Sequence, residues 1–339
     1  MMPFRPLLLF AALLASCVGA RADNDIYLYQ GADREQRLRA GARQEGTLVL
    51  YTSLATTESI PLAQAFEKAY GVKVQLWRAL SENVLQRTIT EARGRRHGVD
   101  VIETNSPELE ALAREQLVST FFSPHAAAHD WAVPAHRLWI GDRVDLFVVA
   151  FNTAKISRAE IPASYEGFLD AKWQGRLALE ATDQEWLGAL VKHWGEERGQ
   201  NFFRRLAGMK PELRKGHVLL AQLIAAGELP VGLTVYSGNA ESIRRSGGPI
   251  DWVAVDPLVG RVQGLALAKN APHPHAALLF ADFVLSSQGA QLLDGFGRVP
   301  TRRDMRTVMD EASYVLVDPA QSAEETARWQ RMWKELFVR

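Results

Sequence analysis

The segment from Gly46 to Trp77 constrains the fold most, because its pattern changes from strand to helix and back to strand. Leu48–Tyr51 reads as a short apolar strand that ends in a polar loop. Leu62–Tyr70 carries apolar residues at helical spacing, and Val72–Leu76 alternates apolar with polar residues. The pattern predicts a β-α-β unit whose first strand opens toward a helix N-terminus, where backbone N–H groups can hold a small solute.

Strands and helices continue to alternate after this unit, so we expect an α/β fold with a mostly parallel sheet and helices on both faces. Val99–Ile102 reads as the third strand. Right-handed crossovers place the loops that follow parallel strands on one edge of a sheet. Three polar loops, Thr52–Thr57, Ala79–Ser81 and Thr104–Ser106, are therefore predicted to converge on one rim.

Hydroxyl side chains precede several of the predicted helices, and we expect them to act as N-caps. Thr57 or Ser59 would cap the first helix with Pro61 in its first turn, and Ser81 would cap the second. Thr182 and Glu185 have the spacing of a capping box for a later helix.

The second half of the chain contains two long extended stretches. The apolar strand Val144–Phe151 precedes a second α/β pattern, which includes the strands Arg176–Glu180 and Pro230–Tyr236. Ile250–Ala268 is the second long stretch, and Pro319–Leu336 is a final amphipathic helical pattern. Two long strands that flank an inserted α/β lobe predict a two-strand hinge.

The first 22 residues predict a secretory signal, since the apolar run Leu7–Ala15 is too short to span a bilayer. Two cleavage sites are open. Ala20–Ala22 is a small-x-small site that gives a soluble periplasmic product, whereas Leu14–Cys17 resembles a lipobox that would anchor the protein by a lipid on Cys17. Because Cys17 is the sole cysteine, the mature fold has no disulfide, thiol nucleophile or thiolate metal site.

Charge and motif content exclude several classes of function. Lys and Arg together number 39, as do Asp and Glu, and this balance argues against a nucleic-acid partner. The sequence contains no phosphate-binding glycine loop, no dinucleotide fingerprint and no Gly-x-Ser-x-Gly elbow. We therefore predict a protein that is not an enzyme and carries no cofactor.

The order of several stretches resembles the bacterial ABC-transporter solute-binding proteins, in the cluster that includes ferric-ion, thiamine, phosphonate and polyamine binders. The match spans roughly residues 46–305. The stretches that carry it are Leu48–Ser53 with Phe66–Val74, Phe168–Arg176, Ala225–Leu233, and Ala271–His275 with Phe280–Ser286 and Gly289.

This resemblance implies the type II periplasmic binding protein fold, in which two α/β lobes close on a solute about a two-strand hinge. In this sequence, lobe 1 would comprise residues 46–143 and 262–305. Lobe 2 with the hinge strands would comprise residues 144–261, and residues 306–339 would form a C-terminal helical segment. The implied partners are a small solute and an inner-membrane ABC permease, and the protein would be a monomer.

The ferric branch of the family offers a comparison. Its members usually place two adjacent tyrosines where this sequence has Tyr236 followed by Ser237. They also often carry a histidine in the first loop and a glutamate in the third, whereas this chain has Ser53–Ala55 and Thr104–Ser106. The anionic oxygen ligands that Fe³⁺ prefers are mostly missing, so we predict no metal site.

The predicted site is rich in hydroxyl and amide groups, which suit an oxyanion when they are combined with helix N-termini. Arg143 is a candidate partner for that anion and Arg78 is a second candidate. Either arginine could instead form a surface or interlobe salt bridge, the interpretation that we favour for Arg78. Glu103 and Asp183 are candidates to receive an amine. The remaining candidate residues are Thr52, Ser53, Ser81, Asn105, Ser106, Thr182, Tyr236 and Asn239.

Aromatic and histidine residues outside this set are interpreted as structural. Trp186 has the position of a buried residue on an amphipathic helix, although it could stack on a ligand. His125 and His129 are four residues apart, a spacing that can bind Zn²⁺, but we interpret them as a surface pair beside a loop.

These observations predict an extracytoplasmic solute-binding component of an ABC importer, with a small oxyanion or zwitterion such as a phosphonate favoured over ferric ion. Two alternatives stay open. One is a periplasmic sensor that reports a solute to a membrane histidine kinase, and the other is a ferric-ion binder of the same family.

Overall fold

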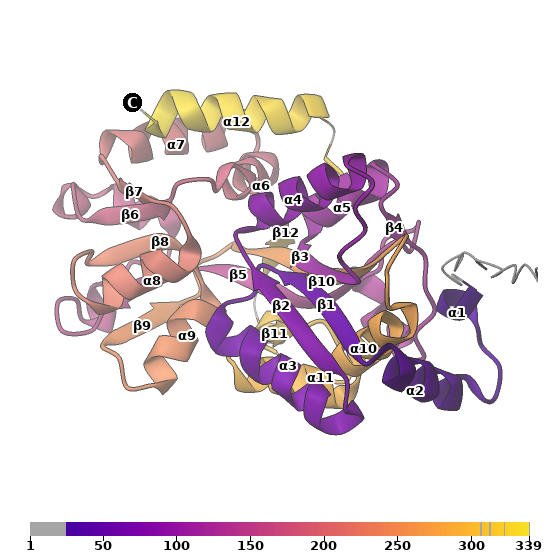
Figure 1. The fold of residues 1–339 in the computed structure, drawn as a ribbon. Helices are drawn as coiled ribbons and strands as arrows, with labels where there is room; N and C mark the ends of the chain where they lie inside the picture. The colour runs from indigo at the N-terminus through magenta and orange to yellow at the C-terminus, as the bar shows by residue number, and fades with distance from the viewer. Residues whose placement is uncertain (1–24, 306, 312, 322, 339) are drawn as a thin grey trace, which may run out of the picture.

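A single curled sheet of twelve strands runs through the computed structural model, which describes residues 25–305, 307–311, 313–321 and 323–338 (Figure 1). Its central order is β2-β1-β3-β10-β5-β8-β6-β7, and four short strands attach to β5 or β10. The strands are β1 Thr47–Thr52, β2 Lys73–Arg78, β3 Val101–Asn105, β4 Val118–Ser119, β5 Ile140–Asn152, β6 Leu177–Glu180, β7 Glu212–Arg214, β8 Val231–Tyr236, β9 Ile250–Val253, β10 Leu258–Ala268, β11 Val299–Pro300 and β12 Tyr314–Leu316.

Helices cover both faces of this sheet (Figure 1). The α-helices are α1 Asp25–Leu28, α2 Arg34–Glu45, α3 Thr56–Tyr70, α4 Ser81–Arg93, α5 Ser106–Arg114, α6 Gln184–Trp194, α7 Glu196–Gly208, α8 His217–Ala225, α9 Ser237–Arg245, α10 Pro274–Leu285, α11 Ser287–Gly295 and α12 Ala323–Phe337. The 3₁₀ helices are η1 Ala126–Ala132, η2 Arg158–Glu160, η3 Tyr165–Leu169, η4 Ala171–Trp173 and η5 Val308–Glu311.

The elements form two lobes joined by two long strands, as the sequence predicted. Lobe 1 contains β1–β4, α1–α5, α10 and α11, and lobe 2 contains β6–β9, α6–α9 and α12. Within the lobes, β1 pairs in parallel with β2 and β3, and β6 pairs in parallel with β7 and β8. The hinge strands β5 and β10 pair antiparallel with each other and reach both lobes. The residue boundaries predicted for the lobes stay a prediction.

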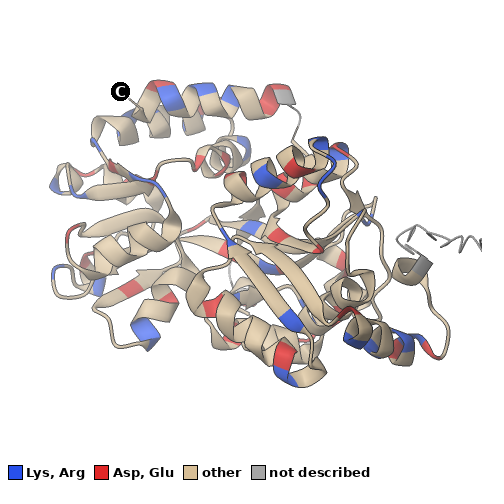
Figure 2. Ribbon diagram, in the orientation of Figure 1, with Lys and Arg blue, Asp and Glu red and all other residues tan. Residues whose placement is uncertain are grey.

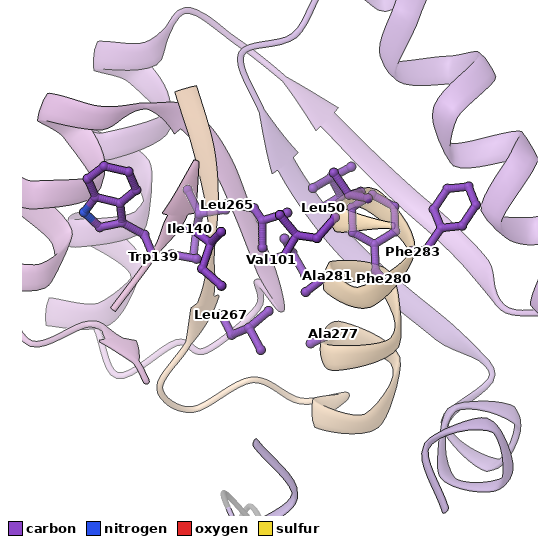
Figure 3. Packing of buried hydrophobic residues seen from close by; sticks show 14 of the residues in the cluster. Leu50, Val101, Trp139, Ile140, Leu265, Leu267, Ala277, Phe280, Ala281 and Phe283 are labelled. Atoms are coloured by element: carbon purple, nitrogen blue, oxygen red, sulfur yellow. The ribbon is translucent and has the colours of Figure 1, made fainter. Parts of the chain in front are cut away.

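Each lobe has its own apolar core. In lobe 1, two phenylalanines of α10 pack toward Phe66 of α3. The ring centroid of Phe66 lies 5.1 Å from that of Phe280 and 5.7 Å from that of Phe283. The same helix packs onto the sheet near Leu50 and Val101 (Figure 3). In lobe 2, Trp186 is fully buried, which confirms the core interpretation of that residue.

The C-terminal helix α12 belongs to the lobe 2 core and lies over α6 and α7 (Figure 1). Its Trp329 packs against Gly188 so closely that a Cβ at this glycine would lie 2.8 Å from the indole ring. Trp333 donates a hydrogen bond from its indole N–H to the carbonyl of Ala181 at 2.9 Å. The helix begins at Ala323 rather than at the predicted Pro319.

The predicted N-caps are wrong. The N-cap positions of α3 and α4 are Ala55 and Leu80, so Ser81 is the first helical residue and Pro61 lies inside α3 rather than in its first turn. The capping box of α6 is absent, because Asp183 is its N-cap and the Thr182 hydroxyl donates to Glu180 instead. The physical reason is common to these sites, since the strand-to-helix loops leave the helix ends facing a cavity rather than a capping side chain.

Two further differences concern which elements form. The predicted stretch Ile250–Ala268 is two strands, β9 and β10, with a cis peptide bond between Asp256 and Pro257. Helices α1 and α2, which the sequence reading did not assign, pack against α10 of lobe 1. The predicted signal segment 1–22 and Cys17 lie outside the described residues.

Charged residues of both signs are interspersed over both lobes in the view of Figure 2. Among the described residues, no single helix has the length and apolarity needed to cross a membrane. Helices α10 and α11, which are bent against each other, reach that length and apolarity only when they are taken together. Most of α10 is buried in lobe 1.

Candidate functional site

A cavity of about 370 Å³ lies between the lobes, at the carboxyl ends of their parallel strands. This is the edge at which ligands bind in open α/β sheets. The lining residues come from both lobes and the hinge: Ser53, Leu54, Ala55, Arg78, Leu80, Ser81, Glu82, Asn105, Glu108, Arg143, Asp145, Glu180, Thr182, Gln184, Glu185, Lys215, Gly216, His217, Val218, Leu219, Gln222, Tyr236, Asn239, Arg261, Gln263 and Arg298.

Six helices begin at this cavity. In lobe 1, β1, β2 and β3 lead into α3, α4 and α5, and in lobe 2, β6, β7 and β8 lead into α6, α8 and α9. None of these helices has a side-chain hydrogen bond from its N-cap residue. The partial positive charge and the first-turn N–H groups of each helix are therefore directed to the cavity, which favours an anionic group there.

The lobe 1 wall carries a positive charge that the protein does not neutralise. Arg78 ends β2, is half-buried, and donates one long hydrogen bond of 3.4 Å to the carbonyl of Ser53. Within the described ranges it makes no ion pair, its Nε is enclosed without a hydrogen-bond partner, and burial lowers its pKa. The Ser53 hydroxyl beside it also has no partner. An oxyanion would satisfy both groups, and the salt bridge expected for Arg78 is not formed with any residue that the structure describes.

Arg143, by contrast, is committed to the hinge. It lies within β5 with 1% of its side chain exposed, and Nη1 donates to Asp142 Oδ1 at 2.9 Å and pairs with Glu103. Its Nη2 donates to the side-chain oxygen of Gln263. Glu103 also accepts from the hydroxyl of Thr52. The guanidinium lines the cavity with its charge already compensated, and Glu103 is not free to receive an amine.

Arg298 joins the two lobes through a buried network. Its Nε and Nη2 donate to the two carboxylate oxygens of Glu58 on α3 at 2.7 and 2.8 Å. Its Nη1 donates to Asp145 on β5 and its Nη2 to Asn239 on α9, both at 2.8 Å. One guanidinium thus connects lobe 1, the hinge and lobe 2 beneath the cavity.

The lobe 2 wall is built around Arg261 and Tyr236. Arg261 of β10 donates to Glu185 at 2.8 Å, lies 3.6 Å from Asp183, and donates to the hydroxyl of Tyr236. The Tyr236 ring stacks on His217, with centroids 3.5 Å apart and planes at 16°. Burial raises the pKa of Tyr236 well above its usual value, so this phenol is neutral and already hydrogen-bonded.

Three lobe 2 residues, Glu180, Asp183 and His217, bring one possible ligand atom each within 4.8 Å of one another. Hydrogen bonds occupy the oxygens of Glu180 and one nitrogen of His217, whereas both oxygens of Asp183 are enclosed without a hydrogen-bond partner. Glu180 accepts from the backbone N–H groups of Thr182 at 2.5 Å and Gly216 at 2.8 Å. His217 Nδ1 donates to a backbone carbonyl, and Nε2 lies 3.3 Å from Asp183. The cluster braces the loops before α6 and α8.

The hydrogen bond from Gly216 to Glu180 depends on an unusual backbone conformation, with a φ of +103° at Gly216. Gly216, the N-cap of α8, has this left-handed φ, which an L side chain rarely adopts. Its backbone N–H donates to Glu180 while its Cα faces the cavity. A glycine is therefore required where β7 turns into α8.

In the described chain, Glu108 is the cavity-lining residue among three acidic groups, with Asp142 and Asp183, that have an enclosed carboxylate oxygen without a hydrogen-bond partner. It lies in the first turn of α5, and its Oε2 is enclosed without a hydrogen-bond partner. Burial, and then the charge of Glu185, raise the pKa of Glu108 to about 7, while Arg261 acts in the opposite direction.

The structure brings seven of the ten predicted site residues to one cavity, and three lie behind its wall. Thr52, Ser106 and Asp183 do not line the cavity and are almost fully buried. The seven that line it are Ser53, Ser81, Asn105, Arg143, Thr182, Tyr236 and Asn239. The three predicted loops of lobe 1 do converge on one rim.

Sequence reasoning missed most of the charged lining. Glu108 and Glu185 carried a signal, because acidic residues in the first turn of a helix at a strand end face the same rim as the loop before it. Arg261 and Arg298 had no such signal, since each occupies a strand or loop defined only by tertiary contacts. His129, interpreted as a surface residue, is buried and bonds the carbonyl of Leu285 at 2.9 Å.

Comparison with known proteins agrees with this architecture. A model of the bacterial extracellular solute-binding protein family matches residues 110–324, which is more than half of the chain. The chain belongs to this family. Its members bind small solutes outside the cytoplasm and deliver them to ABC permeases.

Two relatives with known names are iron proteins. The iron uptake protein A1 of Synechocystis is 24% identical, with 75% of this chain and 74% of the relative covered. The Fe(3+)-binding periplasmic protein of Serratia marcescens is 23% identical, and the match covers 75% of this chain and 78% of the relative.

Solved structures establish the type II periplasmic binding protein fold. Iron-bound HitA from Pseudomonas aeruginosa superposes with a TM-score of 0.70 at 22% identity, covering 86% of this chain and 99% of that one. AfuA from Actinobacillus pleuropneumoniae with bound fructose-6-phosphate superposes with a TM-score of 0.74 at 20% identity, and the match covers 86% of this chain and 98% of AfuA. The substrate-binding protein of an ABC transporter from Agrobacterium tumefaciens superposes with a TM-score of 0.78 at 14% identity, and the match covers 88% of this chain and 96% of that one.

Proposed function

We propose that this member of the family binds a small organic solute through an oxyanion, of the phosphate, phosphonate or carboxylate type, and hands it to an ABC permease without chemical turnover. The observation that carries the proposal is Arg78, a half-buried cation at the cavity wall that makes no ion pair within the described ranges. A desolvated charge of this kind is unfavourable unless a ligand compensates it.

Two further features of the same wall support an anion. The hydroxyl of Ser53 has no partner, and the N-termini of α3 and α4 open onto the cavity on either side of it. Hydrogen bonds from a guanidinium, a hydroxyl and helix N–H groups to an ionised oxygen are stronger than those to a neutral one. The fructose-6-phosphate bound to AfuA is a solute of this type.

Ferric ion is the competing solute, because two relatives carry iron in their names. The cavity offers it one phenol, that of Tyr236, whose oxygen accepts a hydrogen bond from Arg261. Fe³⁺ needs several anionic oxygen ligands, and the carboxylates nearest this phenol, Asp183 and Glu185, already share the charge of Arg261. We therefore favour the oxyanion.

Two substitutions separate these solutes. Isothermal titration with inorganic phosphate, small phosphate esters, phosphonates and ferric citrate would be compared for wild type, Arg78→Gln and Tyr236→Phe. We expect Arg78→Gln to weaken oxyanion binding by about 10- to 100-fold and Tyr236→Phe to change it little. The reverse pattern, with ferric ion bound and lost in Tyr236→Phe, would contradict the proposal.

The protein would act as a monomer and lie outside the cytoplasmic membrane. Whether it is released or anchored through Cys17 depends on the N-terminal segment. Mass spectrometry of the mature protein separates cleavage before Asp23 from lipidation of Cys17.

A further inference from the structure

Two carboxylates approach the cavity from opposite lobes. Glu108 lies in the first turn of α5 in lobe 1, and Glu185 lies in the first turn of α6 in lobe 2. Both line the cavity and they act on each other electrostatically. Because they belong to different lobes, closing the cleft brings them together and opening it separates them.

Glu108 has no cation of its own in the part of the chain that the structure describes. Its Oε2 is enclosed without a hydrogen-bond partner. Arg261, the cation that acts on Glu108, is hydrogen-bonded to Glu185 at 2.8 Å and lies 3.6 Å from Asp183. One guanidinium therefore faces three carboxylates, and the closed cleft has an excess of negative charge at this end.

We propose that Glu108 and Glu185 form a subsite for an ammonium group of the solute, and that a proton takes its place when the cleft closes empty. This inference rests on the cleft being the solute site proposed above. It makes the solute a zwitterion with its anionic end at Arg78. An ammonium offers three donors and a compact positive charge, which match carboxylate oxygens contributed by two lobes.

Groups from the neighbouring elements set the charge of this subsite. Arg261 comes from β10, Asp183 from the N-cap of α6, His217 from α8 and Tyr236 from β8. Burial alone would lower the pKa of His217, but the charges of Asp183 and then Glu180 raise it above its ordinary value. Tyr236 is neutral. Arg261 and His217 together supply at most two positive charges, so the three carboxylates remain in excess.

Other charges on elements packed against α5 already have partners and do not compensate Glu108. These pairs are Glu82 with Lys215, Glu103 with Arg143, and Arg87 with Glu91. The enclosed carboxylate oxygens without a hydrogen-bond partner at this end of the cavity thus belong to Glu108 and Asp183, and Glu185 shares the charge of Arg261 with them.

The first test needs no ligand. Spin labels on exposed residues of each lobe, at Lys68→Cys and Arg204→Cys in a Cys17→Ser background, report the interlobe distance by pulsed electron resonance. For wild type, the closed fraction should fall as the pH rises from about 5.5 to about 8.5, with a midpoint near the pKa of Glu108. Glu108→Gln should stay closed throughout this range.

Two variants complete this test. Glu185→Gln should shift the midpoint to lower pH, because Glu108 loses the like charge beside it. Glu115→Gln, the same change at the far end of α5, should keep the wild-type curve, since Glu115 does not line the cavity. A wild-type distance that does not change with pH, or an unchanged curve in Glu108→Gln, would overturn the proposal.

The second test uses two probes that differ only in the ammonium, 2-aminoethanesulfonate and ethanesulfonate. Wild type should bind the amine at least about tenfold more tightly at pH near 8, and Glu108→Gln should bind the two alike. Equal binding of the two by wild type overturns the proposal. If neither probe binds while ligand-free closure keeps its pH dependence, the oxyanion function fails for sulfonates and the carboxylate subsite stands.

Discussion

The two walls of the cavity are built in the same way but differ in which of their charges have partners. Each wall takes three helix N-termini from the ends of parallel strands. On lobe 1, Arg78 makes no ion pair among the described residues and the Ser53 hydroxyl has no partner, whereas on lobe 2 Asp183 and Glu185 share the charge of Arg261. The difference teaches that the shared scaffold attracts an anion in general, while the side chains decide which end of a solute lies on which wall.

The largest expected effect concerns the network beneath both walls. Arg298→Met would leave Glu58 and Asp145 buried without a counter-charge, and we expect a loss of about 3–5 kcal/mol in the free energy of unfolding. Denaturant unfolding measures it. Arg303→Met, which removes an exposed pair with Asp130, is the control and should change stability little. Similar small losses in both variants would show that the walls are not held by this network.

The next effect compares the cations of the two walls directly. Arg261→Gln should destabilise the protein by about 3 kcal/mol, because Glu185 and Asp183 lose their shared partner. Arg78→Gln should leave stability unchanged or raise it, because Arg78 is desolvated and Glu58, the carboxylate that acts on it, is already paired with Arg298. Thermal unfolding of both variants decides this. Destabilisation by Arg78→Gln equal to that by Arg261→Gln would remove the distinction between the walls.

A pH effect on stability should follow from Glu108. The pKa of Glu108 is raised to about 7 from an ordinary value of 4.5, so the folded state holds a proton that the unfolded state releases between these values. The contribution to stability is therefore present below about pH 4.5 and is lost as the pH rises through 7. Glu108→Gln should be more stable than wild type at pH 8, by on the order of 1 kcal/mol, and similar to it near pH 4.5. An equal difference in unfolding free energy between Glu108→Gln and wild type at both pH values would argue against a buried, uncompensated Glu108.

The smallest effect is expected at the mouth of the cavity, where Glu82 of lobe 1 pairs with Lys215 of lobe 2. Both side chains are about half exposed, so Glu82→Gln should change the free energy of unfolding by no more than about 0.5 kcal/mol. The change should also shrink as salt is added. A large, salt-independent loss would mean that the walls are held together at their rim rather than through Arg298.

The sequence predicted the parts of this molecule that depend on local periodicity. The β-α-β unit at Gly46–Trp77, the alternation of strands and helices, and the two long hinge strands follow from patterns that persist over several residues. The convergence of the three lobe 1 loops follows from the handedness of parallel crossovers. The N-caps were not predictable in this way, because Ala55 and Leu80 occupy those positions and leave the helix ends for a ligand.

The charges of the site were harder to predict, because charge compensation is a tertiary property. Arg143 and Arg78 lie at strand positions that the sequence could not distinguish. Arg143 pairs with Glu103, which is 40 positions away, whereas Arg78 forms no ion pair in the described chain and interacts only at longer range with Glu58. Arg143 is therefore a hinge residue, and Arg78, the second candidate, becomes the first candidate for the anion.

The most direct test of the central claim is a crystal structure of the protein grown with inorganic phosphate as the probe anion. The account predicts density for the anion against the guanidinium of Arg78, the hydroxyl of Ser53 and the first turns of α3 and α4. It also predicts no anion beside Glu108 and Glu185. Phosphate bound on the lobe 2 wall, or a metal ion bound to Tyr236 with Arg78 left empty, would contradict the assignment of the two walls.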